Sequence, residues 1–176
     1  MATRPEQLAE VLNKGLAPVY LVSGDDTLLV TEACDHIVAA AKQQGFTERS
    51  VHHVETGFSW HGLSQDAASM SLFAERKILD VRVASKKLDK EASALLREWV
   101  ADGSSNPDTV LLLRTDRLQP KQRSSAWFKA LEKDGVVVLI WPLSAQEFPR
   151  WLQGRLQHKG LDLQTDALSY LAARVE

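Results

Sequence analysis

The turn Ser23-Gly24-Asp25-Asp26-Thr27 holds the residues of this sequence that come closest to a chemical motif, a phosphate-binding loop. A working loop needs several glycines for backbone approach, a lysine for the outer phosphates and a hydroxyl group for magnesium. This turn has one glycine, no lysine and two carboxylates, which would repel a triphosphate. We therefore predict no nucleotide site here, and we expect Asp26 or Thr27 to cap the helix that follows.

Asp25, Asp26 and Thr115 allow an alternative, a small-ligand or phosphoryl-binding α/β domain that resembles a phosphoacceptor receiver domain. An acidic pair after the first strand and a threonine after the fourth are marks of that fold. It also requires an aspartate at the end of the third strand and a lysine before a proline after the fifth. This chain has Ala84 and Trp141-Pro142 at those places. Without the acceptor carboxylate there is nothing to phosphorylate, so this remains the second hypothesis.

The remaining polar residues offer little further chemistry. One basic cluster should lie at the carboxyl ends of the strands, where it could contact a DNA phosphate backbone. Its members are Arg114, Arg117, Lys121 and Arg123. His52 and His53 are adjacent in an expected strand, so they face opposite ways and cannot bind one metal ion together. Cys34 is the only cysteine and is expected to pack as a small apolar residue. We predict no metal and no cofactor.

Five apolar runs predict the strands that must position these residues. The expected strands are 19–22, 50–54, 77–83, 109–113 and 136–140, and helical patterns lie at 6–15, 27–44, 60–67, 90–101 and 121–133. Continuous apolar runs are typical of strands buried on both faces. Strands that alternate with helices predict parallel pairing through right-handed crossovers. The expected fold class is therefore α/β, with one five-stranded, doubly wound parallel sheet.

The pattern changes after Trp141. From there on the sequence has no strand pattern, only two helical ones, at about 146–159 and from about 164 onward. Ser144 and Glu147 fit a capping box, although Pro149 would then lie within the first turns of that helix. We expect an α/β domain at 1–141 and the start of a helical domain at 142–176. The last helix is still amphipathic at Glu176, so we expect the protein to continue beyond it.

The composition is that of an ordinary globular protein. The 176 residues are 44% hydrophobic and 25% charged. No apolar run approaches the roughly 20 residues that a membrane span needs, and no hydrophobic signal region follows Met1, so we expect a cytoplasmic protein. The net charge of −2 gives no general electrostatic footprint for nucleic acid. If the protein works on DNA, a partner must supply much of the positive field.

Met70, Leu72 and Phe73 lie between an expected helix and an expected strand, with small and polar residues on both sides. Connections normally run over the surface, so three large apolar side chains there indicate a docking point. The other interpretation is that the loop folds inward and Leu72 and Phe73 cap the core. The residues alone leave both interpretations open.

Several segments taken together resemble the delta-subunit family of the bacterial DNA polymerase III clamp loader. They are 5–8 (PEQL), 19–26 (VYLVSGDD) with Leu28-Leu29, 41–46 (AKQQGF), 68–73 (ASMSLF), 126–128 (AWF) and 149–152 (PRWL). The resemblance runs over essentially all 176 residues. It is specific, because the degenerate first turn and the Ser-Leu-Phe before the third strand occur together in the expected places.

This resemblance implies an AAA+ (P-loop NTPase-like) module with a degenerate nucleotide site, followed by a partial helical lid and, beyond Glu176, a collar domain. The delta subunit does not hydrolyse ATP. It binds the ring-shaped sliding clamp and opens it for loading onto primed DNA during replication, as a non-catalytic subunit of a DNA-directed DNA polymerase (nucleotidyltransferase) holoenzyme. The clamp-binding element of the family maps onto Met70, Leu72 and Phe73.

The resemblance also implies the other partners. The gamma/tau and delta prime subunits of the clamp loader would bind through the collar and the faces of the AAA+ module. Primed DNA would be reached through the whole complex, and no membrane is involved.

Overall fold

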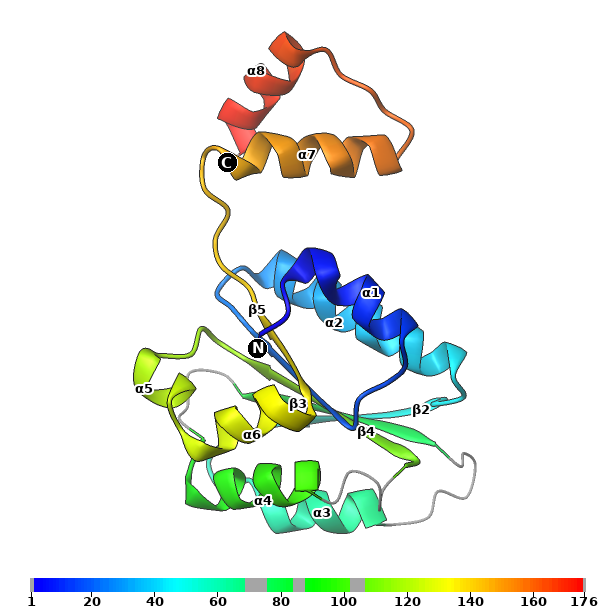
Figure 1. Ribbon diagram of the computed structural model, residues 1–176, viewed down its shortest axis with the longest axis vertical. Helices are drawn as coiled ribbons and strands as arrows, with labels where there is room; N and C mark the ends of the chain where they lie inside the picture. The colour runs from blue at the N-terminus through cyan, green and yellow to red at the C-terminus, as the bar shows by residue number, and fades with distance from the viewer. Residues whose placement is uncertain (1, 69–75, 84–87, 102–106, 176) are drawn as a thin grey trace. The chain divides into compact units, whose positions relative to one another are not determined.

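The computed structural model describes residues 2–68, 76–83, 88–101 and 107–175, and these residues form the expected α/β architecture (Figure 1). The chain divides into two compact units, Met1–Ile140 and Trp141–Glu176. Within the described residues, the first unit holds one five-stranded sheet in the order β2-β3-β4-β1-β5. All neighbouring strands are parallel, as the alternation of strands and helices predicted.

The central strands are buried on both faces. The strands are β1 (Val19–Ser23), β2 (Glu48–His53), β3 (Lys77–Val83), β4 (Thr109–Thr115) and β5 (Val136–Leu139). β1, β3 and β4 lie inside the sheet and are almost wholly buried, which is why they are continuous apolar runs. β2 is an edge strand and begins with the polar residues Glu48 and Arg49. Because these residues are not apolar, the predicted start at residue 50 was two residues too late.

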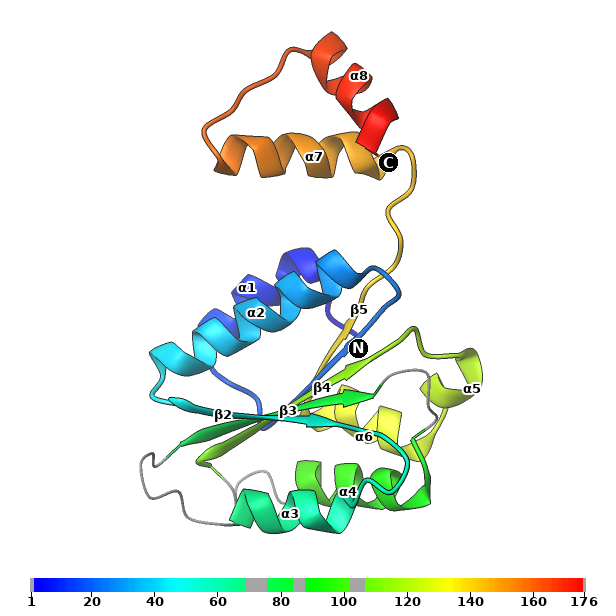
Figure 2. The ribbon, with the colours of Figure 1, turned by 180° about the vertical axis from the view of Figure 1, so that it is seen from behind.

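Helices cover both faces of this sheet. One face carries α1 (Leu8–Asn13), which follows the short 3-10 helix η1 (Pro5–Gln7), and α2 (Thr27–Gln43). The other face carries α3 (Trp60–Ala68), α4 (Lys90–Ala101) and α6 (Ala126–Asp134), as Figure 2 shows from behind. Alternate strand residues supply the two cores, with Tyr20 and Leu112 facing α1 and α2 and with Leu21 and Leu111 facing the other layer.

The single helix expected at 121–133 is wrong, because the structure has two helices there. α5 (Pro120–Arg123) is one turn long, and α6 begins after Ser125. The Ser125 side chain is the N-cap of α6 and accepts a hydrogen bond from the Phe128 N–H at 3.4 Å. A capping serine in this pattern marks a new helix start, since its oxygen satisfies an amide that has no partner in the first turn.

The second unit is a helical hairpin of α7 (Glu147–His158) and α8 (Thr165–Val175). The two helices pack through a small core around Leu152 and Leu168. The reciprocal hydrogen bonds of the predicted capping box are present, since the Ser144 N–H donates to Glu147 Oε2 at 2.9 Å and the Glu147 N–H donates to Ser144 Oγ at 3.3 Å. The helix itself begins later than the box predicted, at Glu147 with Gln146 as its N-cap. Pro149 is the third residue of α7, where a missing N–H removes no intrahelical hydrogen bond.

Candidate functional site

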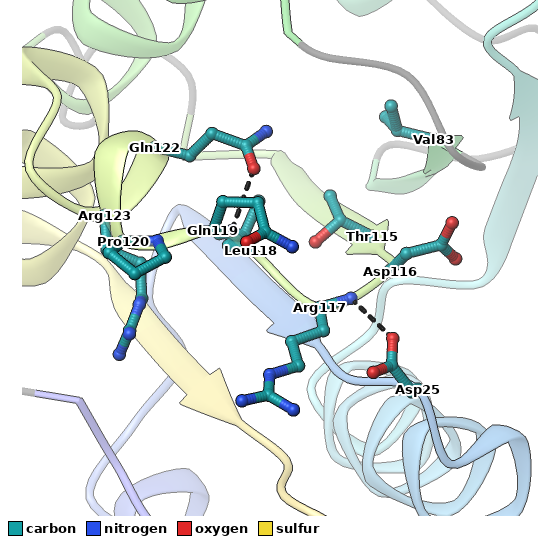
Figure 3. A pocket seen from close by; sticks show the side chains of 10 residues that line it. All are labelled: Asp25, Val83, Thr115, Asp116, Arg117, Leu118, Gln119, Pro120, Gln122 and Arg123. Carbon is teal, nitrogen blue, oxygen red and sulfur yellow. Dashed lines mark hydrogen bonds between the residues drawn. The ribbon is translucent and has the colours of Figure 1, made fainter.

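The turn between β1 and α2 consists of only three residues, Gly24, Asp25 and Asp26. Asp26 is the N-cap of α2, and its Oδ1 accepts from the Leu29 N–H at 3.0 Å, which confirms one of the two capping residues predicted. Asp25 Oδ1 accepts from the backbone N–H of Arg117 at 3.1 Å (Figure 3). The positive end of α2, where a phosphate-binding loop would seat a phosphate, therefore faces a carboxylate of the protein itself.

Gly24 is required by close packing. A Cβ at this position would lie 2.8 Å from both the Cβ and the carbonyl oxygen of Ile140, and 3.2 Å from Val30 Cγ2. The Gly24 N–H also donates to the Thr115 carbonyl at 3.2 Å. The one glycine of the turn thus lets β1 and α2 connect beside the residue that follows β5, and its small size serves this contact.

A pocket of about 630 Å³ lies at the carboxyl ends of β3, β4 and β1 (Figure 3). The guanidinium groups of Arg117 and Arg123 and the carboxylates of Asp25 and Asp116 line it, so the charges of its walls largely cancel. Thr115 is buried there, and its Oγ1 has no hydrogen-bond partner. Such a pocket favours a polar ligand, and its walls do not select strongly for one sign of charge.

The structure separates the four basic residues that were predicted to contact DNA. Arg117 and Arg123 line the pocket, and Lys121 is exposed in α5 nearby. Arg114 lies in β4, where only 12% of its side chain is exposed and its guanidinium group is bonded to Asp80. Three of the four residues are therefore brought together at the carboxyl ends of the strands.

Asp80 is a buried carboxylate in the middle of β3 that the sequence analysis missed. Arg114 Nε and Nη2 donate to its two oxygens at 2.9 and 3.0 Å, and Arg49 Nη2 donates to Oδ2 at 2.5 Å. Arg82 Nη2 lies 3.7 Å from the same oxygen. The signal in the sequence was one aspartate between the apolar residues Leu79 and Val81 of a buried strand, since a buried carboxylate needs partners. The network joins β2, β3 and β4.

Cys34 lies in α2 and is fully buried. Burial raises the pKa of its thiol from 9.0 to about 12, and the nearby charge of Arg114 opposes that rise only in part. A protonated, inaccessible thiol is a poor nucleophile and metal ligand. Cys34 therefore packs as a small apolar residue, as predicted.

Met70, Leu72 and Phe73 lie outside the described residues, but the elements on both sides of them are described. α3 ends at Ala68 and β3 begins at Lys77. Lys77 is buried, and its Nζ donates to the main-chain carbonyl of Asp66 in the last turn of α3. These flanking contacts define where the chain leaves α3 and where it enters β3.

Over 2–68, 76–83, 88–101 and 107–175, no group of three histidine, cysteine, aspartate or glutamate side chains is placed to hold a metal ion. In the same part of the chain, none of the helices combines the length and the apolar character that crossing a bilayer requires.

Residues 20–140 match the family model described as "DNA polymerase III, delta subunit". The chain belongs to this family. It is 31% identical over 161 residues to DNA polymerase III subunit delta of Escherichia coli (strain K12), a match that covers 90% of this chain and 46% of that protein. DNA polymerase III subunit delta of Haemophilus influenzae is 31% identical over 177 residues, a match that covers 98% of this chain and 50% of that protein. The chain thus spans about half the length of these curated relatives.

Solved structures support the fold. The Bacillus subtilis DNA clamp loader delta protein superposes with a TM-score of 0.67 at 21% identity, covering 95% of this chain and 51% of that one. AMPPCP-bound DnaA from Aquifex aeolicus superposes with a TM-score of 0.52 at 13% identity, and the match covers 98% of this chain and 54% of that one. A RuvB mutant from Thermotoga maritima superposes with a TM-score of 0.51 at 16% identity, and the match covers 96% of this chain and 54% of that one. DnaA and RuvB are AAA+ proteins, so the predicted AAA+ type of fold is confirmed.

The receiver-like alternative is not favoured by the strand order. Receiver domains have the order 2-1-3-4-5, in which the first strand lies between the second and the third. Here β1 lies between β4 and β5. In addition, Asp25 and Asp26 each accept a backbone hydrogen bond.

Proposed function

We propose that this chain is the clamp-binding part of a clamp-loader delta subunit, which binds the ring-shaped sliding clamp and opens it for loading onto primed DNA. Membership of the DNA polymerase III delta family supports this role. The observation that carries the proposal is the three-residue turn between β1 and α2, with Asp26 at the N-terminus of α2. Such a turn supports a subunit that hydrolyses no ATP and acts by binding.

The proposed clamp-binding element is Met70, Leu72 and Phe73. Burial of a leucine or phenylalanine side chain contributes about 1.5 to 3 kcal/mol. Leu72 and Phe73 together would contribute about 3 to 6 kcal/mol before the ordering costs of binding. Two such anchors in a pocket behave as a hot spot, and the remaining contacts supply complementarity.

Ring opening needs no chemistry in this chain. A binding protein shifts an equilibrium by the difference in its affinity for the two states, so it suffices that the anchor binds the opened clamp more tightly than the closed one. In this proposal ATP is bound by neighbouring subunits, and this chain transmits their motion. The gamma/tau and delta prime subunits bind through the faces of the AAA+ module and a collar, and the complex works on primed DNA in the cytoplasm.

A direct DNA contact is a second, smaller proposal. Arg117, Lys121 and Arg123 lie together at the carboxyl ends of the strands, and such groups bind phosphate oxygens without reading sequence. Arg114 is left out, because its guanidinium group is bonded to Asp80. The carboxylates of Asp25 and Asp116 in the same pocket weaken the attraction, so the contact should add little without the other subunits.

The first experiment is a calorimetric titration of this chain with the sliding clamp of the same organism. The double variant Leu72→Ala with Phe73→Ala should bind at least a hundredfold more weakly than the unsubstituted chain, because each 1.4 kcal/mol is a factor of ten. Leu28→Ala with Leu161→Ala is the matched control, since both leucines are exposed and neither belongs to the element. Equal affinities for the double variant and the control would contradict the anchor assignment.

The second experiment tests the absence of nucleotide chemistry. Titration of the chain with ATP and magnesium should give no binding heat at millimolar nucleotide. Tight ATP binding, or turnover that grows with chain concentration, would contradict the proposed role as a binding subunit.

A further inference from the structure

Thr115, the last residue of β4, is only 7% exposed, yet its hydroxyl group is unsatisfied. Its carbonyl accepts the Gly24 N–H, but Oγ1 has no hydrogen-bond partner among the described residues. Native structures leave few buried hydroxyl groups unpaired, because this costs free energy. Thr115 lines the pocket of about 630 Å³, and in Figure 3 its oxygen is directed toward the middle of the lining residues. A polar atom of a ligand in this pocket would satisfy it.

The charged groups of the pocket are of both signs. Arg117 and Arg123 supply two guanidinium groups, and Figure 3 shows both side chains pointing to the same side. Asp25 and Asp116 supply two carboxylates. Oδ1 of Asp25 accepts the Arg117 N–H at 3.1 Å, which leaves Oδ2 as a further acceptor. A ligand that suits these walls carries one negative group and, in another part, N–H groups that donate to carboxylates.

The rest of the lining limits the size and shape of the ligand. Val83 and Leu118 are buried, and together with Pro120 they give the pocket an apolar wall against which a planar ring can lie. A volume of about 630 Å³ is within the range of about 300 to 1,000 Å³ that is usual for small-molecule sites. None of the described lining residues is aromatic, so a ring would be held by hydrogen bonds more than by stacking.

We propose that this pocket binds one nucleotide of single-stranded DNA, with its phosphate at Arg117 and Arg123 and its base against Thr115 and the carboxylates. This inference rests on the proposed direct DNA contact and deepens it. A backbone phosphate carries one negative charge, which guanidinium groups bind with two parallel hydrogen bonds. An aspartate accepts a hydrogen bond from the exocyclic amino group of cytosine, and thymine has no such group. The carboxylates that suit a base repel the multiply charged triphosphate of ATP.

The test is fluorescence anisotropy of labelled oligonucleotides titrated with this chain at about 50 mM salt, since phosphate contacts weaken as salt rises. A short single strand of deoxycytidine should bind about fivefold or more tightly than a thymidine strand of the same length. It should bind about tenfold more tightly than a strand with the same phosphates whose sugars carry no base. Annealing it to its complement should weaken binding, because a paired base must first be flipped out.

Two substitutions separate the base from the phosphate. Thr115→Val removes the hydroxyl and keeps the shape of the side chain. Because this hydroxyl has no partner in the free chain, the urea midpoint should not fall, yet the deoxycytidine strand should bind about fivefold more weakly. Arg123→Gln removes a charge at the phosphate and should weaken the deoxycytidine and base-free strands by the same factor. Thr47→Val and Lys133→Gln, at exposed residues outside the pocket, are the matched controls and should bind like the unsubstituted chain.

Methyl NMR signals report on the pocket directly. The methyl groups of Thr115, Val83 and Leu118 should shift when the deoxycytidine strand is added, because the base is the part that reaches them. They should stay in place with the base-free strand. Leu168, in the core of the helical hairpin, is the internal reference and should not shift with either strand.

The outcomes distinguish this inference from the proposals on which it rests. A base-free or thymidine strand that binds as tightly as the deoxycytidine strand, or unchanged binding by Thr115→Val, overturns the inference. Where Arg123→Gln still weakens binding, the proposed DNA contact then stands without a base in the pocket. If no strand binds, the DNA contact fails and the inference fails with it. Clamp binding is measured in its own titration, with Leu72→Ala and Phe73→Ala, and none of these results bears on it.

Discussion

Arg114 in β4 donates from Nε and Nη2 to the two carboxylate oxygens of Asp80 in β3, at 2.9 and 3.0 Å. The carboxylate is fully buried and also accepts from Arg49 of the edge strand β2. Charge-assisted, two-pronged pairs of this kind are the strongest hydrogen bonds in proteins and fix the relative positions of their groups. Arg114, which the sequence placed at a possible DNA interface, therefore belongs to a network around Asp80 that joins three strands.

Substituting Asp80→Asn should destabilise the chain strongly. It leaves the charges of Arg49 and Arg114 without their carboxylate, and breaking a buried ion pair from one side costs about 3 to 5 kcal/mol. Urea unfolding followed by tryptophan fluorescence measures the free energy of unfolding. Asp134→Asn is the control, because Asp134 pairs with an exposed lysine, and it should change that free energy by less than about 0.5 kcal/mol. A loss below about 1 kcal/mol at Asp80 would show that the network is not a stabilising element.

Substituting Asp26→Ala should lower stability by about 0.5 to 2 kcal/mol, because it removes the N-cap of α2. Asp26→Ser keeps an oxygen that can accept from the Leu29 N–H and should lose much less. The comparison is made by thermal and urea unfolding of both variants. If serine costs as much as alanine, the carboxylate is not acting as a cap.

Substituting Gly24→Ala should destabilise by about 1 to 3 kcal/mol, the usual cost of forcing an extra carbon into a packed region. The added methyl group would lie 2.8 Å from a backbone oxygen of Ile140, which cannot rotate away as a side chain can. Gly62→Ala is the matched control, since its Cβ would meet only Ser59 atoms at 3.4 Å and Gly62 lies in the first turn of α3, where alanine is the better helix former by up to about 1 kcal/mol. The two variants should therefore move the urea midpoint in opposite directions.

The sequence predicted the central strands best, because burial on both faces requires almost every residue in them to be apolar. β1, β3 and β4 are buried on both faces, so their apolar runs alone predicted strands. Edge strand β2 begins with Glu48 and Arg49, which give no apolar signal, and its start was misplaced. The break between α5 and α6 was missed because no glycine or proline lies between Lys121 and Lys133 to mark it, while the capping role of Ser125 depends on backbone geometry.

The candidate site was predictable only in part. The degenerate turn and its capping aspartate follow from local chemistry, since a cap bonds within the next three residues. Asp80 was missed because its partners Arg49 and Arg114 are 31 and 34 residues away along the chain. The contact between Lys77 and Asp66 likewise joins a strand to the helix before it. The two residues are 11 positions apart, so no local sequence pattern predicts their contact.

The buried thiol of Cys34 makes stability depend on pH in alkaline solution. Its pKa is raised by burial from 9.0 to about 12 in the folded chain. The unfolded chain therefore loses this proton first as the pH rises above 9, and unfolding becomes more favourable. The contribution is fully present below pH 9 and falls by up to about 1.4 kcal/mol per pH unit on the way to pH 12.

The matched variant for this prediction is Cys34→Ala, because other groups also titrate in alkaline solution. Burial raises the pKa of Tyr20 too, and that contribution is common to both proteins. The difference in the free energy of unfolding between the two chains, measured by urea at pH 8 and at pH 10.5, isolates the thiol. The unsubstituted chain should lose more stability over this range than Cys34→Ala. A difference that stays constant would mean that the thiol ionises as readily in the folded chain as in the unfolded one, and so that α2 does not seal this face of the sheet from water.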